Sequence, residues 1–93
     1  MKTQLESPHK GEITALEFAF TKKIWSGDKE GLICVWDESG TILKQMYNRT
    51  KESTISPVVD IKASIDFAFV AGQKTISIYD LLVLILLSCS ILH

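Results

Sequence analysis

The feature that most constrains the fold of this chain is an internal repeat with a period of 43–45 residues. Two segments of the first unit recur at an offset of 45 residues and a third at 43, because the second unit has two residues fewer in one turn. The matched pairs are Ile13–Leu16 with Val58–Ile61, Trp25–Gly27 with Val70–Gly72, and Ile33–Asp37 with Ile76–Asp80. A repeated sequence predicts a repeated local structure, so the chain is interpreted as two similar units.

Each unit consists of short runs rich in β-branched and aromatic residues, separated by glycine and polar residues, a pattern that favours strands. The connections within a unit are short enough for antiparallel hairpins. No apolar stripe of helical period extends beyond two turns before residue 80. We therefore expect an all-β fold. The predicted strands are Ile13–Phe18, Lys23–Gly27, Leu32–Asp37, Ile42–Tyr47, Val58–Lys62, Phe67–Gly72 and Thr75–Asp80.

Two of these strands, within Leu32–Trp36 and Phe67–Ala71, are apolar at both alternating positions. Side chains on a strand point alternately to the two faces of its sheet, so these strands require cover on both faces. Sheets stacked around an axis provide that cover. A period of about 40–50 residues is also typical of propeller blades. The sequence thus predicts antiparallel four-stranded propeller blades.

Motifs in the first unit make this expectation more specific. His9 precedes the first strand, Ser26-Gly27 closes the second, Gly31 lies in a tight turn, and Trp36-Asp37 ends the third. In this order and spacing, residues 5–80 resemble the repeats of the WD-repeat β-propeller family, and Tyr79-Asp80 makes the second repeat a degenerate copy. The resemblance implies an incomplete WD-repeat β-propeller of about two blades, whereas propellers usually have about four to eight.

The resemblance also implies a structural hydrogen-bond tetrad, with Glu30 at the turn position where the family usually has Asp. The matching residues are His9, Ser26, Glu30 and Trp36. Such a tetrad would tie the loop before the first strand to the inner strands through buried polar groups. In the second repeat the corresponding positions hold Thr54, Ala71 and Tyr79, and the turn carboxylate is deleted. That blade would then depend on apolar packing.

The chain divides into a lead-in (1–8), a first blade (9–47), a linker loop (48–56), a degenerate second blade (57–80) and an atypical hydrophobic tail (81–93). The tail has three interpretations. As a helix, Leu81–Leu92 would span ~18 Å, which is short of a ~30 Å bilayer core. As an outer strand it would be unusually apolar for a sheet edge. The third interpretation, favoured here, is sequence from a truncated or mis-predicted reading frame.

Composition excludes several classes of function. Ten Lys and Arg residues against eleven Asp and Glu give a net charge of −1, and a nucleic-acid binder is expected to be basic. Cys34 and Cys89 are too few for a disulfide framework, and no secretory signal opens the chain, so we expect a cytoplasmic location. Two cysteines and two histidines without paired spacing predict no metal site. We expect no cofactor and no enzymatic activity.

The resemblance implies a non-catalytic protein–protein interaction module, a scaffold segment that binds a protein or peptide through loops at one rim. The predicted contact residues are Lys10, Glu12, Trp25, Asp28 and Lys29, although Trp25 also fits core packing against a neighbouring blade. The segment would belong to a larger regulatory propeller, or copies of it would close a ring as a homo-oligomer. Two alternatives stay open: a truncated product without function, and a small membrane-associated protein held by residues 81–92.

Overall fold

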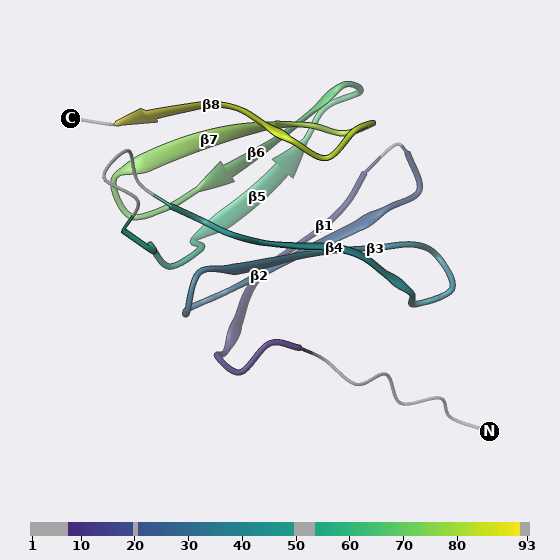
Figure 1. The fold of residues 1–93 in the computed structure, drawn as a ribbon, viewed down its shortest axis with the longest axis horizontal. Helices are drawn as coiled ribbons and strands as arrows, with labels where there is room; N and C mark the ends of the chain where they lie inside the picture. The colour runs from purple at the N-terminus through teal and green to yellow at the C-terminus, as the bar shows by residue number, and fades with distance from the viewer. Residues whose placement is uncertain (1–7, 20, 50–53, 92–93) are drawn as a thin grey trace.

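The computed structural model describes residues 8–19, 21–49 and 54–91, which form two four-stranded antiparallel sheets (Figure 1). The strand order is β1-β2-β3-β4 in the first sheet and β5-β6-β7-β8 in the second, and no helix occurs in these ranges. The prediction of an all-β fold is confirmed. The strands are β1 Ile13–Phe18, β2 Ile24–Asp28, β3 Leu32–Trp36, β4 Ile42–Tyr47, β5 Asp60–Ala63, β6 Phe67–Ala71, β7 Thr75–Asp80 and β8 Leu86–Ile91.

Aspartate and glycine build the two hairpin turns of the first sheet that lead into and out of β3. Gly31 and Gly40 have φ angles of 87° and 91°, in the left-handed region that glycine adopts most readily. Each glycine N–H donates to the carbonyl of the aspartate three residues earlier, Asp28 or Asp37. These turns place consecutive strands side by side and fix their register.

The pairing registers of the two sheets correspond row by row. One row of the first sheet contains Glu17, Trp25, Val35 and Lys44, and its counterpart in the second contains Lys62, Phe69, Ile78 and Ser88. The irregularity in the β3–β4 register at Val35/Trp36 recurs in β7–β8 at Ile78/Tyr79.

This correspondence corrects one predicted alignment. The rows match Trp25 with Phe69, an offset of 44 residues between β2 and β6 rather than 45. Ser26 therefore corresponds to Val70, and the assignment of Ala71 to that position is wrong. Because side chains alternate between faces, a slip of one residue moves Ala71 to the opposite face of the sheet.

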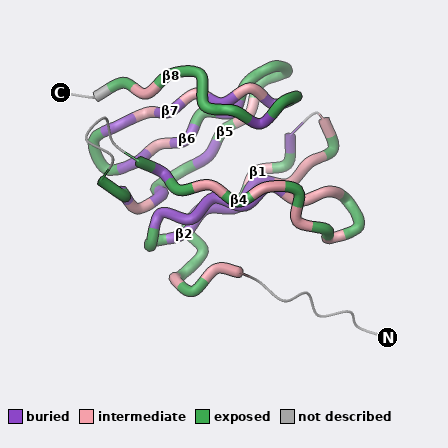
Figure 2. The backbone as a smooth tube through the Cα atoms, in the orientation of Figure 1, coloured by how far each residue is buried: buried purple, intermediate pink, exposed green. Residues whose placement is uncertain are grey.

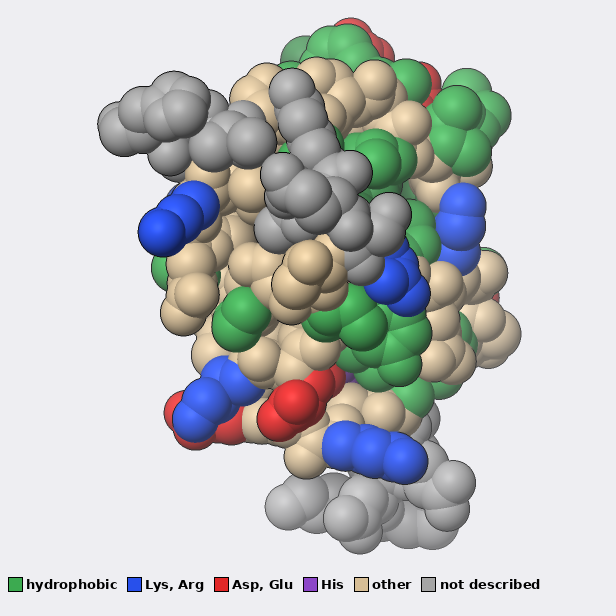
Figure 3. Space-filling model, turned by 60° about the vertical axis from the view of Figure 1, so that its left-hand side comes forward, with side chains coloured by type: hydrophobic (Ala, Val, Ile, Leu, Met, Phe, Trp, Pro, Cys, Tyr) green, Lys and Arg blue, Asp and Glu red, His purple; other side chains and the backbone are tan. Residues whose placement is uncertain are grey.

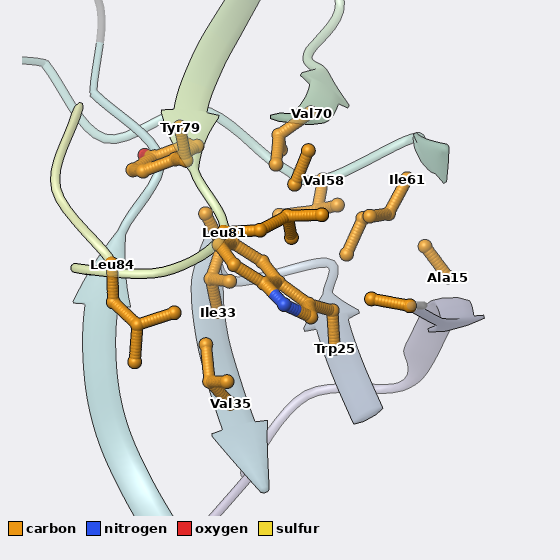
Figure 4. Close-up of a cluster of buried hydrophobic side chains, with 12 residues drawn as sticks. Ala15, Trp25, Ile33, Val35, Val58, Ile61, Val70, Tyr79, Leu81 and Leu84 are labelled. Atoms are coloured by element: carbon orange, nitrogen blue, oxygen red, sulfur yellow. The ribbon is translucent and has the colours of Figure 1, made fainter. Parts of the chain in front are cut away.

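The sheets stack with their principal hydrophobic core between them, and Trp25 lies at its centre (Figure 4). The Trp25 side chain is fully buried, and its ring centroid lies 5.6 Å from that of Tyr79. Backbone and side-chain hydrogen bonds also cross the interface. The Val58 N–H donates to the Asp28 carbonyl at 2.9 Å, and the Ala63 N–H donates to the Glu17 carboxylate at 2.8 Å. Figure 2 shows buried stretches in both sheets, and in β2 and β3 successive residues are buried, so both faces of these strands are covered.

The segment predicted as an atypical tail completes the second sheet. Asp80 begins a turn in which its carboxylate accepts the Leu82 and Val83 N–H groups, and Leu86–Ile91 then pairs antiparallel with β7 as β8. Of the three interpretations, the outer strand is the one that the structure contains, so the second sheet extends beyond residue 80. Leu81 and Leu84 turn into the core, which explains part of the apolar character. No helix in the described ranges is long and apolar enough to cross a membrane.

The predicted linker is anchored to the first sheet at both of its described ends. Asn48 is fully buried, its N–H donates to the Gly31 carbonyl, and its own carbonyl accepts the Ser56 N–H, both at 2.7 Å. Arg49 and Ile55 form an isolated antiparallel bridge. The middle of this loop and all of the lead-in except Pro8 lie outside the described residues.

Candidate functional site

A buried chain of hydrogen bonds links the loop before β1 to β2 and β3. His9 Nδ1 lies 2.6 Å from Asp28 Oδ2, and His9 Nε2 lies 2.6 Å from Ser26 Oγ. The Trp36 indole N–H donates to the same Ser26 Oγ at 2.9 Å. The side chains of His9 and Asp28 are 1% and 0% exposed, so water does not compete for these bonds.

The chemistry of the partners fixes the direction of two of the three bonds. A carboxylate only accepts and an indole only donates, so the proton between Asp28 and His9 is on Nδ1, and Ser26 accepts from Trp36. The third bond joins His9 Nε2 and Ser26 Oγ, either of which can carry the hydrogen between them. All four side chains are satisfied by one another in this arrangement.

The carboxylate in this network belongs to Asp28, and the prediction that Glu30 supplies it is wrong. Asp28 lies two residues after Ser26 and therefore points to the same face of the sheet. Its second oxygen, Oδ1, accepts the backbone N–H groups of Glu30 at 2.8 Å and Leu32 at 3.0 Å. The Asp28 carboxylate thus binds His9 with one oxygen and closes the turn with the other. Glu30 lies in the turn with an exposed side chain.

Ser26, His9 and Asp28 are hydrogen-bonded in the same order as the catalytic triad of serine hydrolases. A nucleophilic serine must reach a substrate carbonyl, but Ser26 is 3% exposed and its oxygen already accepts the Trp36 N–H. The geometry favours a structural tie between three segments of the chain over a nucleophile.

The matching positions of the second sheet hold Val70, Gly72 and Tyr79, so no equivalent network forms there. A Cβ atom at Gly72 would lie 2.9 Å from Thr75 Oγ1 and 3.0 Å from both Asn48 Nδ2 and Ser56 Oγ. Polar side chains from the linker and β7 thus occupy the space that Asp28 fills in the first sheet. Thr54, the predicted histidine counterpart, is exposed.

The predicted partner contacts separate into exposed and buried residues. Lys29 and Glu12 form an ion pair at 3.7 Å with side chains 61% and 74% exposed, and Lys10 is exposed nearby. Trp25 and Asp28 are fully buried, so their prediction as surface contacts is wrong. The interpretation of Trp25 as core packing is confirmed.

A depression of about 530 Å³ adjoins these exposed charges at the β2–β3 end of the first sheet. Its lining residues are Pro8, Lys10, Asp28, Glu30, Leu32, Gln45 and Tyr47. On the face shown in Figure 3, Lys and Arg side chains lie apart from one another among hydrophobic and polar surface. The rim carries both signs of charge, because Lys10 and Lys29 lie there beside Glu12 and Glu30.

The two free cysteines lie in different environments. Burial, with the nearby charge of Asp28 adding to it, raises the pKa of the Cys34 thiol from 9.0 to about 11, so that thiol stays protonated at neutral pH. Cys89 is partly exposed, and its Sγ lies 3.7 Å from the Arg49 carbonyl oxygen. Among the described residues no group of three or more potential ligands comes together around a possible metal position.

A comparison of the chain with models of known protein families finds no match.

Proposed function

We propose that this chain is a non-catalytic protein–protein interaction module of the WD-repeat type, in which stacked sheets hold loops at one rim for binding a protein or peptide. The hydrogen-bonded network of His9, Asp28, Ser26 and Trp36 is the observation that carries the proposal. It uses four polar side chains, buried or partly buried, to fix one short loop, and such a fixed loop costs little entropy when it binds.

The proposed binding surface is the rim formed by that loop and the β2–β3 turn. Lys10, Glu12 and Lys29 lie there with exposed side chains beside the depression at Tyr47 and Gln45. Exposed charges of both signs suit a polar peptide segment that alternates in charge, because complementary pairs give specificity and orientation. This surface is proposed to bind without any cofactor.

A pair of charge-swap variants tests the rim. In Glu12→Lys with Lys29→Glu, the exposed ion pair is reversed and the net charge is unchanged. In the matched control, Lys22→Asp with Asp66→Lys, charges are exchanged at the other end of the strands. Quantitative affinity capture from a cell extract should show at least one protein that the unmodified chain and the control retain and the rim variant loses at least ten-fold.

Equal capture by all three proteins would contradict the proposed surface. Circular dichroism of each variant establishes that the sheets are intact, since exposed substitutions usually change the free energy of unfolding by no more than about 0.5 kcal/mol.

A further inference from the structure

A hollow lies on the face of the first sheet that points away from the second sheet. Its volume is about 450 Å³, and its lining residues are Leu16, Ile24, Ser26, Trp36, Asp37, Glu38, Ser39 and Gly40. Leu16 on its wall is 70% exposed, and Phe18, on the same face of β1, is 61% exposed. This face therefore presents a large apolar surface around an open hollow that is large enough to take an aromatic side chain.

The corresponding place on the second sheet is occupied by Trp25 of the first. By register, Leu16, Ile24, Ser26 and Trp36 correspond to Ile61, Ala68, Val70 and Tyr79. These four residues of the second sheet are buried in one cluster with Trp25, whose ring packs against Tyr79. The hollow on the first sheet is thus the counterpart of a site that already holds an aromatic side chain.

The other open face of the molecule carries a matching aromatic residue. Phe69 corresponds to Trp25 by register, and it is 36% exposed on the face of the second sheet that points away from the first. Lys62 lies directly opposite Phe69 in the β5–β6 pair, while Asp37 and Glu38 line the hollow. An aromatic ring with an ammonium group beside it therefore complements an apolar hollow with carboxylates at its edge.

We propose that two copies of this chain associate head to tail, with Phe69 of one copy inserted into the hollow of the next and packed against its Trp36. A second copy is the occupant that carries both complementary faces. Within one chain the two sheets stack face to face (Figure 1). The proposed contact is the same kind of stacking, formed between two chains. Because the two surfaces differ, the interface is heterologous, and it can propagate or close into a ring. The inference involves sheet faces and is independent of the proposed rim.

Complementation between two variants tests this arrangement on the full chain. Phe69→Asp blocks one face and Leu16→Asp blocks the other, and circular dichroism of each variant establishes that its sheets are intact. Light scattering after size exclusion should give the unmodified protein a mass at least twice that of a protomer, and each variant alone the mass of a monomer. An equimolar mixture should form a dimer, because one intact interface remains between the two variants.

Ile65→Asp, at a site 71% exposed outside both faces, serves as the control and should assemble like the unmodified protein. Three results would overturn the proposal: a monomeric unmodified protein, assembly that survives either variant, and a mixture that stays monomeric. The last would indicate a symmetric contact. A monomer whose hollow takes up another protein would identify a different occupant and equally reject a second copy.

Discussion

At the scale of single residues, Asp28 joins three parts of the structure through its carboxylate and its backbone carbonyl. One of its oxygens holds His9, the other closes the β2–β3 turn, and its carbonyl accepts the Val58 N–H from the second sheet. A buried carboxylate is stable only when such partners replace its hydration. Removing it would break the bond to His9 Nδ1 and the bonds to two backbone donors of the β2–β3 turn.

We expect Asp28→Ala to lower the free energy of unfolding by about 3 kcal/mol, because it removes a buried charged acceptor from its partners. Glu30→Ala, at the exposed neighbour two residues on, should change it by no more than about 0.5 kcal/mol. Asp28→Asn retains an oxygen for the turn and should fall between the two. Urea denaturation of the three variants measures the difference. An equal loss in the free energy of unfolding for Asp28→Ala and Glu30→Ala would indicate that Glu30 also takes part in the network.

At the scale of elements, three turns share one design. Asp28, Asp37 and Asp80 each accept a backbone N–H from two residues later through Oδ1. The pKa of Asp37 is lowered by hydrogen bonds to its carboxylate. The largest effect comes from the Ser39 hydroxyl, followed by the Thr41 N–H. The first two turns end on a glycine with positive φ, whereas the third has Leu84 with φ 58°. Leu84 retains this strained conformation because its side chain is buried in the core.

The β3–β4 turn gives a test of this design. Gly40→Ala should lower the free energy of unfolding by about 1–2 kcal/mol, because a side chain at φ 91° meets the steric cost of the left-handed region. Glu38→Ala, in the same turn but exposed, is the control and should be close to neutral. Thermal unfolding followed by circular dichroism compares the two. A neutral Gly40→Ala would show that this glycine is free to take another conformation.

At the scale of the whole molecule, the two sheets depend on one another for a core. Trp25 from the first sheet and Tyr79 and Leu81 from the second belong to the same buried cluster. The outer strand β8 remains mostly exposed, with Leu86 and Leu87 each about half exposed. Exposed apolar edges favour edge-to-edge association, which is a different contact from the face-to-face one inferred between copies.

This shared core predicts that the sheets unfold together. Trp25→Ala should cost about 3–5 kcal/mol and should reduce amide hydrogen-exchange protection in β6 and β7 as well as in β2 and β3. Ile65→Ala, in the exposed β5–β6 turn, is the control and should leave protection unchanged. Loss of protection confined to the first sheet would show that the second sheet is stable without the Trp25 side chain.

Much of the fold is predictable from local sequence. Every strand before residue 81 lies within two residues of its predicted position, because alternating apolar runs and aspartate–glycine turns act through neighbours along the chain. The β8 strand was not predicted as the favoured interpretation, since an apolar edge strand is atypical and Leu84 replaces the expected glycine. For the network, His9, Ser26 and Trp36 followed from the motif. The carboxylate was predicted wrongly as Glu30, although the alternation from Ser26 to Asp28 was a signal in the sequence that could have identified it.

The sequence by itself determined the first seven strands, the turns of the first sheet and the repetition of a similar unit, because these depend on residues close together in the chain. Only the tertiary structure decided which carboxylate reaches His9, that Trp25 is enclosed, and that Leu16 and Phe69 remain on open faces. Those outcomes depend on which face of a sheet meets another sheet, and a single sequence does not fix that choice when both faces are apolar.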